Sequence, residues 1–417
     1  MPNDAEILYA LFDAALKAAL PDGQFEGRLP EKPKGRTIVI GAGKASARMA
    51  AAFEDAWART GGTCEGLVVT RYRHAVPTRS VEIVEAAHPV PDEAGLQAAG
   101  RILALAREAG PDDLVVCLMS GGASALLSLP AEGVTLADKQ DLNRALLKSG
   151  APIGEMNLVR KSLSAIKGGR LAAAAQRAKL VTYLISDVPG DDPSSIGSGP
   201  TIPERVDPDV ALAILRKYGI DVPDPVLQVI RSNAVTEPVA GGEVHMLATP
   251  KMALDAAAAK AREFGLTPLV LGDALEGEAR EVGRVMAGIA RSAAMHGEPA
   301  KAPCVLLSGG ETTVTVRGKG RGGRNAEFLL SLALALKDEN GIAAIACDTD
   351  GIDGSEDNAG AWFDGGLFDD ARSKGIDLAA HLESNDAYTA FAQLDKLVVT
   401  GPTLTNVNDF RCILIRS

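Results

Sequence analysis

Thr37-Ile-Val-Ile-Gly-Ala-Gly-Lys-Ala-Ser46 is the stretch of sequence that decides the fold. A short β-branched run enters a glycine turn, and an alanine-rich pattern at helical spacing follows as far as Ala58. This order predicts a buried strand, a tight turn and a helix, the opening of a parallel βαβ unit. Lys44 then lies where a strand-to-helix turn presents its side chain at the end of a sheet.

Apolar runs continue to alternate with helical patterns downstream of this stretch. In the N-terminal half the runs lie at 66–70, 81–84, 113–119 and 180–185. The alternation predicts parallel strands in an α/β sandwich, with ligands bound at the ends of the strands. Prolines and glycines concentrate at 222–242, so we predict two domains, 1–235 and 236–417. Apolar runs at 245–248, 268–271, 304–307, 343–347, 397–400 and 412–415 assign strands to the second domain.

Length and composition restrict the class of protein. The chain has 417 residues, of which 46% are hydrophobic and 23% charged, enough for more than one core. A net charge of −11 and an aromatic content of 4% argue against nucleic acid as a partner. We expect no membrane partner and a cytoplasmic location, because no apolar run approaches a membrane span and the first residues lack a secretory pattern. The five cysteines are far apart, so we expect neither disulfides nor a structural metal.

A second glycine-rich stretch concentrates positive charge. It reads Ser308-Gly-Gly-Glu-Thr-Thr-Val-Thr-Val-Arg-Gly-Lys-Gly-Arg-Gly-Gly-Arg-Asn325 and leads into an apolar helical pattern. Converging backbone N–H groups, basic side chains and the start of a helix favour a bound anion. The alternative is a flexible, solvated loop.

The turn at Gly41–Ser46 supports more than one chemistry. Lys44 could neutralise charge during phosphoryl transfer, or be a solvated lysine in a first helical turn. As a dinucleotide-binding fingerprint the turn is weak, because Ser46 occupies the third glycine position. Arg71 and Arg73 could still accept the 2′-phosphate of a cofactor of the NADP type. The chain contains no Walker A sequence.

Other turns carry candidate polar groups. Ser120-Gly-Gly-Ala-Ser124 can offer N–H groups and hydroxyls to phosphate, although such turns are also ordinary packing devices. Carboxylates follow several predicted strands and could hold Mg²⁺ or orient a hydroxyl. They are Asp187, Asp191, Asp348, Asp350 and Asp353. For Asp191, Asp353 and the neighbouring Asp192 we favour an ordinary turn role.

Nine motifs together resemble the glycerate 2-kinase family with a C-terminal MOFRL domain, whose members are often labelled hydroxypyruvate reductases. The motifs are Gly-Ala-Gly-Lys-Ala-Ser (41–46), His-Pro-Val-Pro-Asp (88–92), Ser-Gly-Gly-Ala-Ser-Ala-Leu (120–126), Lys-Gly-Gly-Arg-Leu-Ala (167–172), Ser-Asp-Val-Pro-Gly-Asp (186–191), Gly-Ser-Gly-Pro-Thr (197–201), Gly-Gly-Arg-Asn (322–325), Asp-Thr-Asp-Gly-Ile-Asp-Gly (348–354) and Asn-Val-Asn-Asp (406–409). The resemblance spans nearly the whole chain. It implies a larger Rossmann-like α/β/α domain and a smaller mixed α/β domain, with the active site in the cleft between them. Ala326 and Leu404 depart from the expected family pattern and affect substrate detail more than reaction type.

The resemblance implies transfer of the γ-phosphate of ATP to the 2-hydroxyl of D-glycerate, with Mg²⁺ as cofactor. Lys44 and Arg324 match the family's proposed catalytic residues, and we add Asp187. Further predicted site residues bind phosphate, substrate or metal. For the nucleotide phosphates they are Gly41, Gly43, Ser120, Gly121, Gly122, Ser124, Ser198, Gly199 and Thr201; for the substrate Arg321, Glu311, Asn325 and Asn408; for Mg²⁺ Asp187 and Asp350.

Several alternatives stay open. Either Arg324 or Arg321 could grip the glycerate carboxylate, because a planar guanidinium suits that group. An NAD(P)H-dependent hydroxypyruvate reductase and a non-enzymatic phosphate- or sugar-acid sensor are the competing functions. The oligomeric state is open, with a homodimer as one candidate.

Overall fold

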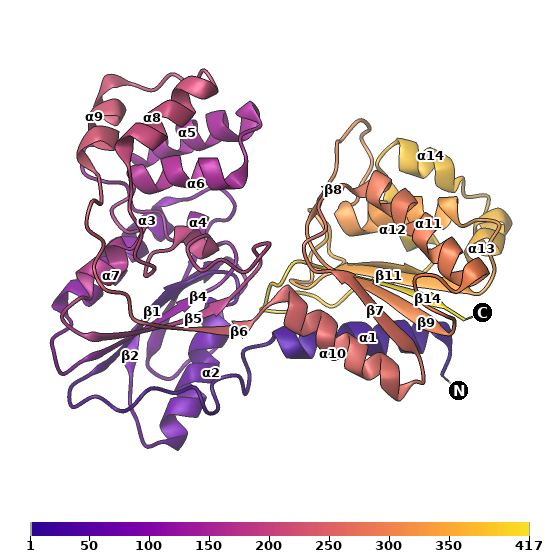
Figure 1. Ribbon diagram of the computed structural model, residues 1–417, viewed down its shortest axis with the longest axis horizontal. Coiled ribbons are helices and arrows are strands. Elements are labelled where there is room, and N and C mark those ends of the chain that lie inside the picture. Colours follow the sequence, from indigo (N-terminus) through magenta and orange to yellow (C-terminus); the bar gives the residue numbers. More distant parts are fainter. Residues whose placement is uncertain (1, 417) are drawn as a thin grey trace. The chain divides into compact units, whose positions relative to one another are not determined.

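A computed structural model describes residues 2–416, and its contacts divide the chain into two compact units. The first unit is Pro21–Leu247, and the second combines the N-terminal segment up to Leu20 with the chain from Ala248 onward (Figure 1). This division differs from the predicted domains, 1–235 and 236–417. The N-terminal helix packs with the second unit, and the strand after residue 236 joins the first.

The first unit is built on a six-stranded sheet with the strand order β3-β2-β1-β4-β5-β6. The strands are β1 (Thr37–Ala42), β2 (Glu65–Arg71), β3 (Val81–Ala86), β4 (Leu114–Met119), β5 (Lys179–Ile185) and β6 (Glu243–Ala248). Every pairing from β3 through β5 is parallel. The chain runs outward from β1 to β2 and β3, then continues on the other side with β4, so the order reverses between β1 and β4. Ligands of open α/β sheets bind at such a reversal, outside the carboxyl ends of the strands.

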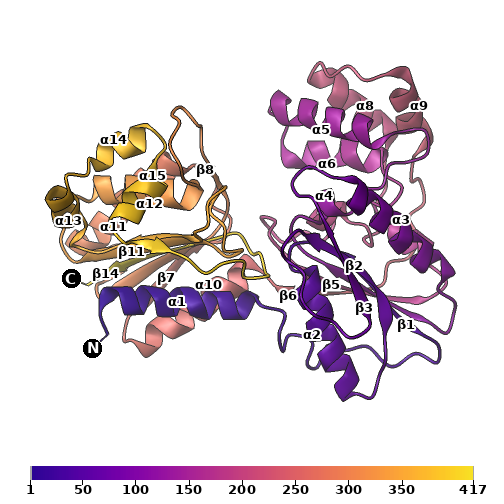
Figure 2. The ribbon, with the colours of Figure 1, turned by 180° about the vertical axis from the view of Figure 1, so that it is seen from behind.

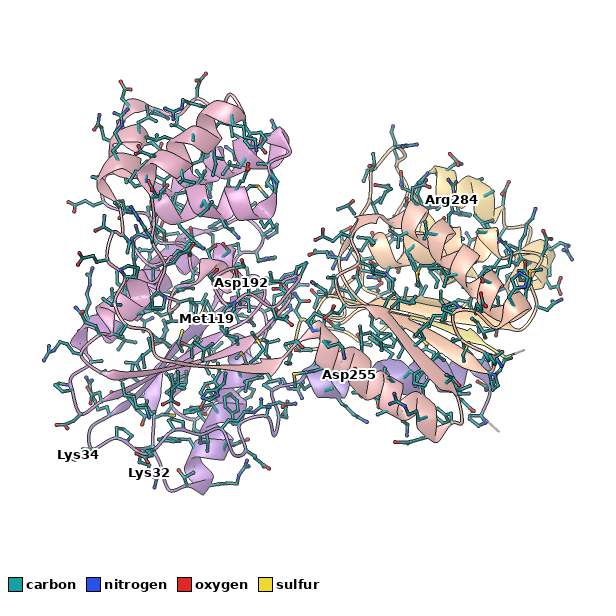
Figure 3. The ribbon with its side chains drawn as sticks, viewed as in Figure 1. Lys32, Lys34, Met119, Asp192, Asp255 and Arg284 are labelled. Carbon is teal, nitrogen blue, oxygen red and sulfur yellow. The ribbon has the colours of Figure 1, made fainter. Side chains whose placement is uncertain are left out.

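Helices cover both faces of this sheet. Helix α2 (Ser46–Arg59) lies on one face and α3 (Glu93–Glu108) on the other (Figures 1 and 2). Strands β1 and β4 are therefore buried along their whole length, as their continuous apolar sequences predict. Met119, at the end of β4, lies inside the unit, whereas Lys32 and Lys34 project from its surface (Figure 3).

A helical layer with its own core completes the first unit. The layer contains α5 (Leu136–Ser149), α6 (Ile153–Ser162), α8 (Pro208–Lys217) and α9 (Asp224–Ser232). Buried leucine, isoleucine and valine side chains join these helices. The short helices α4 (Ala123–Leu126) and α7 (Arg170–Ala174) connect the layer to the sheet region. Apolar residues at helical spacing from 157 to 175 favour a single helix, but α6 ends at Ser162 and the left-handed residues Gly168 and Gly169 precede α7.

The second unit contains a six-stranded mixed sheet in the order β13-β12-β11-β14-β9-β7. The strands are β7 (Thr267–Gly272), β9 (Cys304–Ser308), β11 (Ile342–Asp348), β12 (Gly360–Phe363), β13 (Leu397–Val398) and β14 (Asp409–Ile415). Only β7 and β9 pair in parallel; the other pairs are antiparallel. A separate parallel pair joins β8 (Gly277–Glu278) and β10 (Thr312–Thr313).

Helices also cover both faces of the mixed sheet. The helices α11 (Ala279–His296) and α12 (Arg324–Ala335) lie on one face, together with α13 (Leu367–Lys374), α14 (Leu378–Glu383) and α15 (Ala387–Gln393). Helices α1 (Asp4–Ala19) and α10 (Pro250–Glu263) lie side by side on the other face (Figures 1 and 2). The Phe12 ring of α1 lies 5.7 Å from the Phe410 ring of β14. The predicted fold class, a Rossmann-like α/β/α part and a mixed α/β part, is confirmed.

Candidate active site

Two glycine turns of the first unit lock together at the strand-order reversal. The amide of Lys44, just after β1, donates to the Gly121 carbonyl at 2.8 Å. The next amide, that of Ala45, donates to Ser120 Oγ at 3.0 Å. The turn after β1 and the turn after β4 therefore form one rigid substructure at the reversal, where the sheet topology predicts a ligand.

Glycine is required at two positions of this substructure. Gly43 has a φ of +139°, and a Cβ there would lie 2.1 Å from Ser120 Oγ. Gly122 has a φ of +80°, and a Cβ there would lie 3.1 Å from the His88 ring and 3.3 Å from Cγ of Lys44. The backbone of Gly122, the stem of Lys44 and the His88 ring therefore converge.

A third glycine-rich loop contacts the same turn. Gly197, Ser198 and Gly199 all have positive φ, at 60°, 64° and 58°. The hydroxyls of Ser124 and Ser198 lie 2.9 Å apart, which joins this loop to the helix that follows Gly122. Thr201 differs from these residues, because its buried hydroxyl accepts a bond from Thr182 at 2.9 Å. Asp187, two residues beyond β5, is half-buried.

A cavity of about 250 Å³ opens beside Gly122 and Ser124. Three basic side chains line it, and the predicted site residues include none of them. They are Lys139 of α5, Arg160 of α6 and Lys167 of the loop before α7. Lys167 begins one of the nine motifs. Lys139 and Arg160 lie in ordinary amphipathic helical patterns, which do not distinguish a cavity-lining cation from a solvated one.

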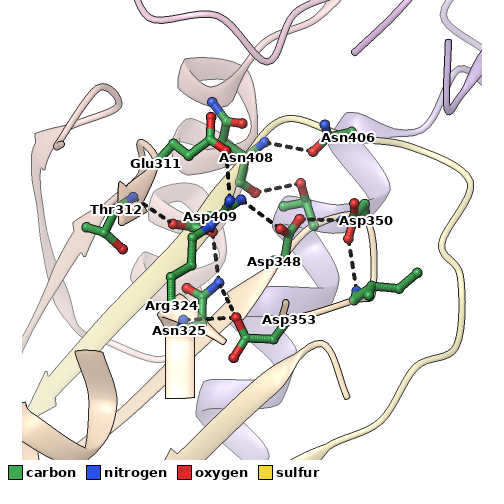
Figure 4. A network of polar contacts seen from close by, with 12 residues as sticks. Glu311, Thr312, Arg324, Asn325, Asp348, Asp350, Asp353, Asn406, Asn408 and Asp409 are labelled. Carbon is green, nitrogen blue, oxygen red and sulfur yellow. Dashed lines mark hydrogen bonds and ion pairs between the residues drawn. The ribbon is translucent and has the colours of Figure 1, made fainter. Parts of the chain in front are cut away.

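In the second unit, Arg324 is the first residue of α12 and contacts three carboxylates (Figure 4). Its Nε donates to Asp409 at 2.8 Å, one terminal nitrogen to Asp348 at 2.8 Å, and the other to Glu311 at 2.7 Å. Burial alone would lower the pKa of Arg324, but Asp409, Asp348 and Glu311 outweigh it and raise that pKa. The guanidinium is therefore firmly charged and held in one orientation.

Asp409 was not among the predicted site residues, although it ends the Asn-Val-Asn-Asp motif. It is the first residue of β14 and is buried. One of its oxygens accepts from Arg324 and from Nδ2 of Asn325, and the other accepts from Arg411 at 2.5 Å. Asp409 therefore orients both arginines, which the sequence could not reveal because 85 residues separate it from Arg324.

Asp353, expected to be an ordinary turn residue, caps the start of α12. Its carboxylate accepts from the amides of Asn325 at 3.0 Å and Ala326 at 2.9 Å. Burial raises the pKa of Asp353 to about 6, against the opposing effect of these two bonds. The turn interpretation of Asp353 is incomplete, since the residue fixes the helix that carries Arg324.

The remaining predicted residues of this unit have separate surroundings. Arg321 pairs with Glu356 and lies 4.4 Å above the Tyr388 ring, with its side chain 60% exposed. Asp350 accepts from the Ile352 amide at 2.9 Å. Asn408 adopts a φ of +63°, and its carbonyl accepts from the Thr349 hydroxyl at 2.7 Å.

Metal ligands do not cluster in the part of the chain that the structure describes. Among residues 2–416, no group of three or more His, Cys, Asp and Glu side chains is arranged to hold a metal ion. Mg²⁺ that binds together with a nucleotide does not need such a group, because it takes one or two protein carboxylates and completes its shell with phosphates and water. Between residues 2 and 416 the structure contains no helical segment that could span a lipid bilayer.

Taken together, the fold and these sites define an α/β protein with anion-binding turns in one unit and a buried arginine–carboxylate network in the other. Comparison with known proteins places it in a family. Residues 7–231 match the domain of unknown function DUF4147, and residues 304–409 match the MOFRL family.

Similar proteins carry two kinds of name. A protein of Agrobacterium vitis called "Putative hydroxypyruvate reductase" is 57% identical over 98% of this chain and 94% of its own length. The D-glycerate 2-kinase of Thermotoga maritima is 40% identical over 95% of this chain and 94% of its own length. A crystal structure of a glycerate kinase from Thermotoga maritima superposes with a TM-score of 0.91, at 39% identity, covering 99% of this chain and all of that one. The chain belongs to the DUF4147–MOFRL family, which includes these glycerate kinases.

Proposed function

We propose that this protein is a glycerate 2-kinase, which transfers the γ-phosphoryl group of ATP to the 2-hydroxyl of D-glycerate and releases 2-phosphoglycerate and ADP. One observation supports the proposal above all others. The stem of Lys44 lies against Gly122, where two interlocked glycine turns meet at the reversal of strand order. A lysine and converging backbone amides at this position suit a transferring phosphoryl group, whose charge they can neutralise.

Two turns of the first unit hold the nucleotide phosphates in this proposal. The turn at Ser120–Gly122 and the loop at Gly197–Gly199 contain left-handed residues, and their backbone can approach phosphate oxygens where a side chain would obstruct it. Ser124 and Ser198 contribute hydroxyls. Gly41, Gly43 and Thr201 support the loops from behind, since their surroundings are protein backbone or another hydroxyl.

Arg324 is the second charged participant. Its guanidinium is fixed by three carboxylates, so it is oriented before any ligand arrives. In this proposal the same group interacts with the phosphoryl group in flight. Glu311, Asn325 and Asn408, together with the more exposed Arg321, contribute to recognition of the glycerate.

Mg²⁺ is part of the proposal. When bound, Mg²⁺ would neutralise charge on the phosphate oxygens. Asp187 and Asp350 are the carboxylates proposed to hold it, and Asp187 could alternatively orient the 2-hydroxyl. The proposed partners are ATP and D-glycerate, in the cytoplasm.

One assay with two arms tests the function. The first arm mixes purified protein, D-glycerate, ATP and Mg²⁺, and detects 2-phosphoglycerate through enolase. The second arm offers hydroxypyruvate and NADPH, because the name of the Agrobacterium relative and the Gly41–Ser46 turn favour a reductase as second candidate. Product in the first arm alone supports the kinase. Oxidation of NADPH without 2-phosphoglycerate would replace it with the reductase, and inactivity in both arms would favour a sensor.

A further inference from the structure

Three cations line the cavity in the first unit, and no carboxylate among the lining residues neutralises them. Lys139, Arg160 and Lys167 all line this cavity, and its described lining contains neither Asp nor Glu. Repulsion among these cations contributes to lowering the pKa of both lysines, although burial is the larger cause. Burying a charge without a partner of opposite charge reduces the stability of the folded protein.

The acceptors around two of the cations are neutral. Arg160 donates from Nε to Asn143 Oδ1 at 2.9 Å, and from a terminal nitrogen to Asn157 Oδ1 at 3.2 Å. Lys167 donates from Nζ to the carbonyl and hydroxyl of Ser124, at 2.6 and 2.8 Å. These bonds fix the cations but leave their charge available.

The third cation has an unused donor. Nζ of Lys139 is buried, and the described residues provide no hydrogen-bond acceptor for it. Buried ammonium groups are normally paired, so Nζ of Lys139 is placed to donate to an acceptor outside the chain.

The surroundings indicate which anion belongs there. Lys167 braces Ser124, and the cavity reaches Gly122, whose other neighbour is the stem of Lys44. A chain of phosphates could therefore extend from these cations along Gly122 toward Lys44. Three positive charges match a polyphosphate better than the single carboxylate of a hydroxy acid. The prolines Pro89 and Pro91 line the same cavity and offer apolar surface to the rest of a nucleotide.

We infer that Lys139, Arg160 and Lys167 form the subsite for the polyphosphate chain of the nucleoside triphosphate, a role that rests on the proposed kinase function. Lys139 contacts the phosphates directly, Arg160 contributes a fixed guanidinium, and Lys167 holds the Ser124 turn while adding charge.

Substitution of Lys139 tests the inference, with Lys148 as a matched control. Both lysines lie on α5, but Lys148 is exposed. Binding of inorganic tripolyphosphate and of ATP to the full chain is measured by calorimetry at constant ionic strength. We expect Lys139→Met to weaken both by about tenfold or more, Lys148→Met to leave both unchanged, and Lys139→Arg to restore part of the affinity.

Steady-state kinetics distinguish the subsite from the function. The Lys139→Met variant should raise KM for ATP about tenfold and leave KM for D-glycerate within about twofold. Wild-type protein that binds neither probe, or a Lys139→Met variant that binds both normally, would overturn the inference. An increase in KM for D-glycerate alone would also overturn it by assigning the cavity to the hydroxy acid. Loss of tripolyphosphate binding in a protein that never phosphorylates glycerate would retain the subsite and reject the kinase.

Discussion

Lys139 illustrates at the residue scale how a binding function and stability can conflict. Burial, with a smaller effect from Arg160, lowers the pKa of Lys139 from 10.5 to about 8. Lys139→Met should therefore raise the free energy of unfolding of the ligand-free protein by roughly 1–3 kcal/mol near neutral pH. Urea denaturation of Lys139→Met and Lys148→Met, compared with wild type, measures the difference.

The pH dependence of that difference follows from the direction of the pKa shift. Between about 8 and 10.5 the unfolded chain binds more protons at Lys139 than the folded chain does. Wild-type stability from this group therefore rises with pH across that interval, and the advantage of Lys139→Met disappears. A Lys139→Met variant that is less stable than wild type at neutral pH would contradict this account of Lys139.

Lys44 carries the strongest catalytic prediction at the same scale. Lys44→Ala should lower kcat about a thousandfold or more, because the ammonium would act on charge that develops in the transition state. The far-ultraviolet circular dichroism spectrum should stay unchanged. Lys32→Ala, on the exposed surface of the same unit, serves as the control. A near-normal kcat for Lys44→Ala would remove this residue from the mechanism.

Helix α12 gives the prediction at the scale of elements. Asp353 accepts from two amides at the start of this helix, so Asp353→Ala should reduce the free energy of unfolding by about 2–3 kcal/mol. The helix start should also exchange its amide hydrogens faster. Asp369→Ala, which removes an exposed carboxylate of α13, should change stability by less than about 0.5 kcal/mol.

The raised pKa of Asp353 gives this prediction a second readout. Between 3.8 and about 6 the folded chain retains a proton at Asp353 that the unfolded chain has lost. The contribution of this group to stability therefore falls as pH rises through that interval. A difference between wild type and Asp353→Ala that does not change from pH 4 to pH 6 would show that Asp353 is not buried as described.

Some helices and strands could be predicted from the sequence and others could not. The strands of the first sheet were predictable, because continuous β-branched runs between helical patterns have few other uses. The break between α6 and α7 was missed, since Gly168 and Gly169 there take a left-handed backbone that the apolar periodicity does not report. Strand β12 and helices α8 and α9 also escaped prediction.

Candidate sites were predictable where chemistry is local. The glycine turns were predictable from their high glycine content, because neighbouring backbone lies too close to these positions to leave room for a side chain. Asp409, a buried partner of Arg324, was not predictable in this way, since it lies on β14, 85 residues further along the chain. The cavity lined by Lys139, Arg160 and Lys167 could not be predicted from the sequence either. These residues come together only because α5 and α6 fold over the turn at Gly122.

At the scale of the whole molecule, the second unit is built from two segments that are far apart in the sequence. The N-terminal helix α1 belongs to the second unit, through the Phe12–Phe410 contact and the bond from Thr405 to the Ala19 carbonyl at 2.6 Å. Phe12→Ala should reduce the free energy of unfolding of that unit by about 3–5 kcal/mol. Hydrogen exchange should accelerate in β14 and stay unchanged in β1.

A matched variant in the first unit supplies the control. Phe53 stacks on Trp57 at 5.6 Å and is fully buried. Phe53→Ala should accelerate exchange in β1 and spare β14. Faster exchange in β1 alone after Phe12→Ala would contradict the assignment of α1 to the second unit.

We propose that Lys44 and Arg324 are both catalytic residues for the transfer of phosphate to D-glycerate. The most direct measurement is the rate of 2-phosphoglycerate formation in Lys44→Ala, Arg324→Lys and the double variant. We predict that Lys44→Ala lowers kcat about a thousandfold or more, that Arg324→Lys lowers it about a hundredfold or more, and that the double variant is little slower than the slower single one. Losses that multiply in the double variant, or a near-normal rate in either single variant, would contradict the claim.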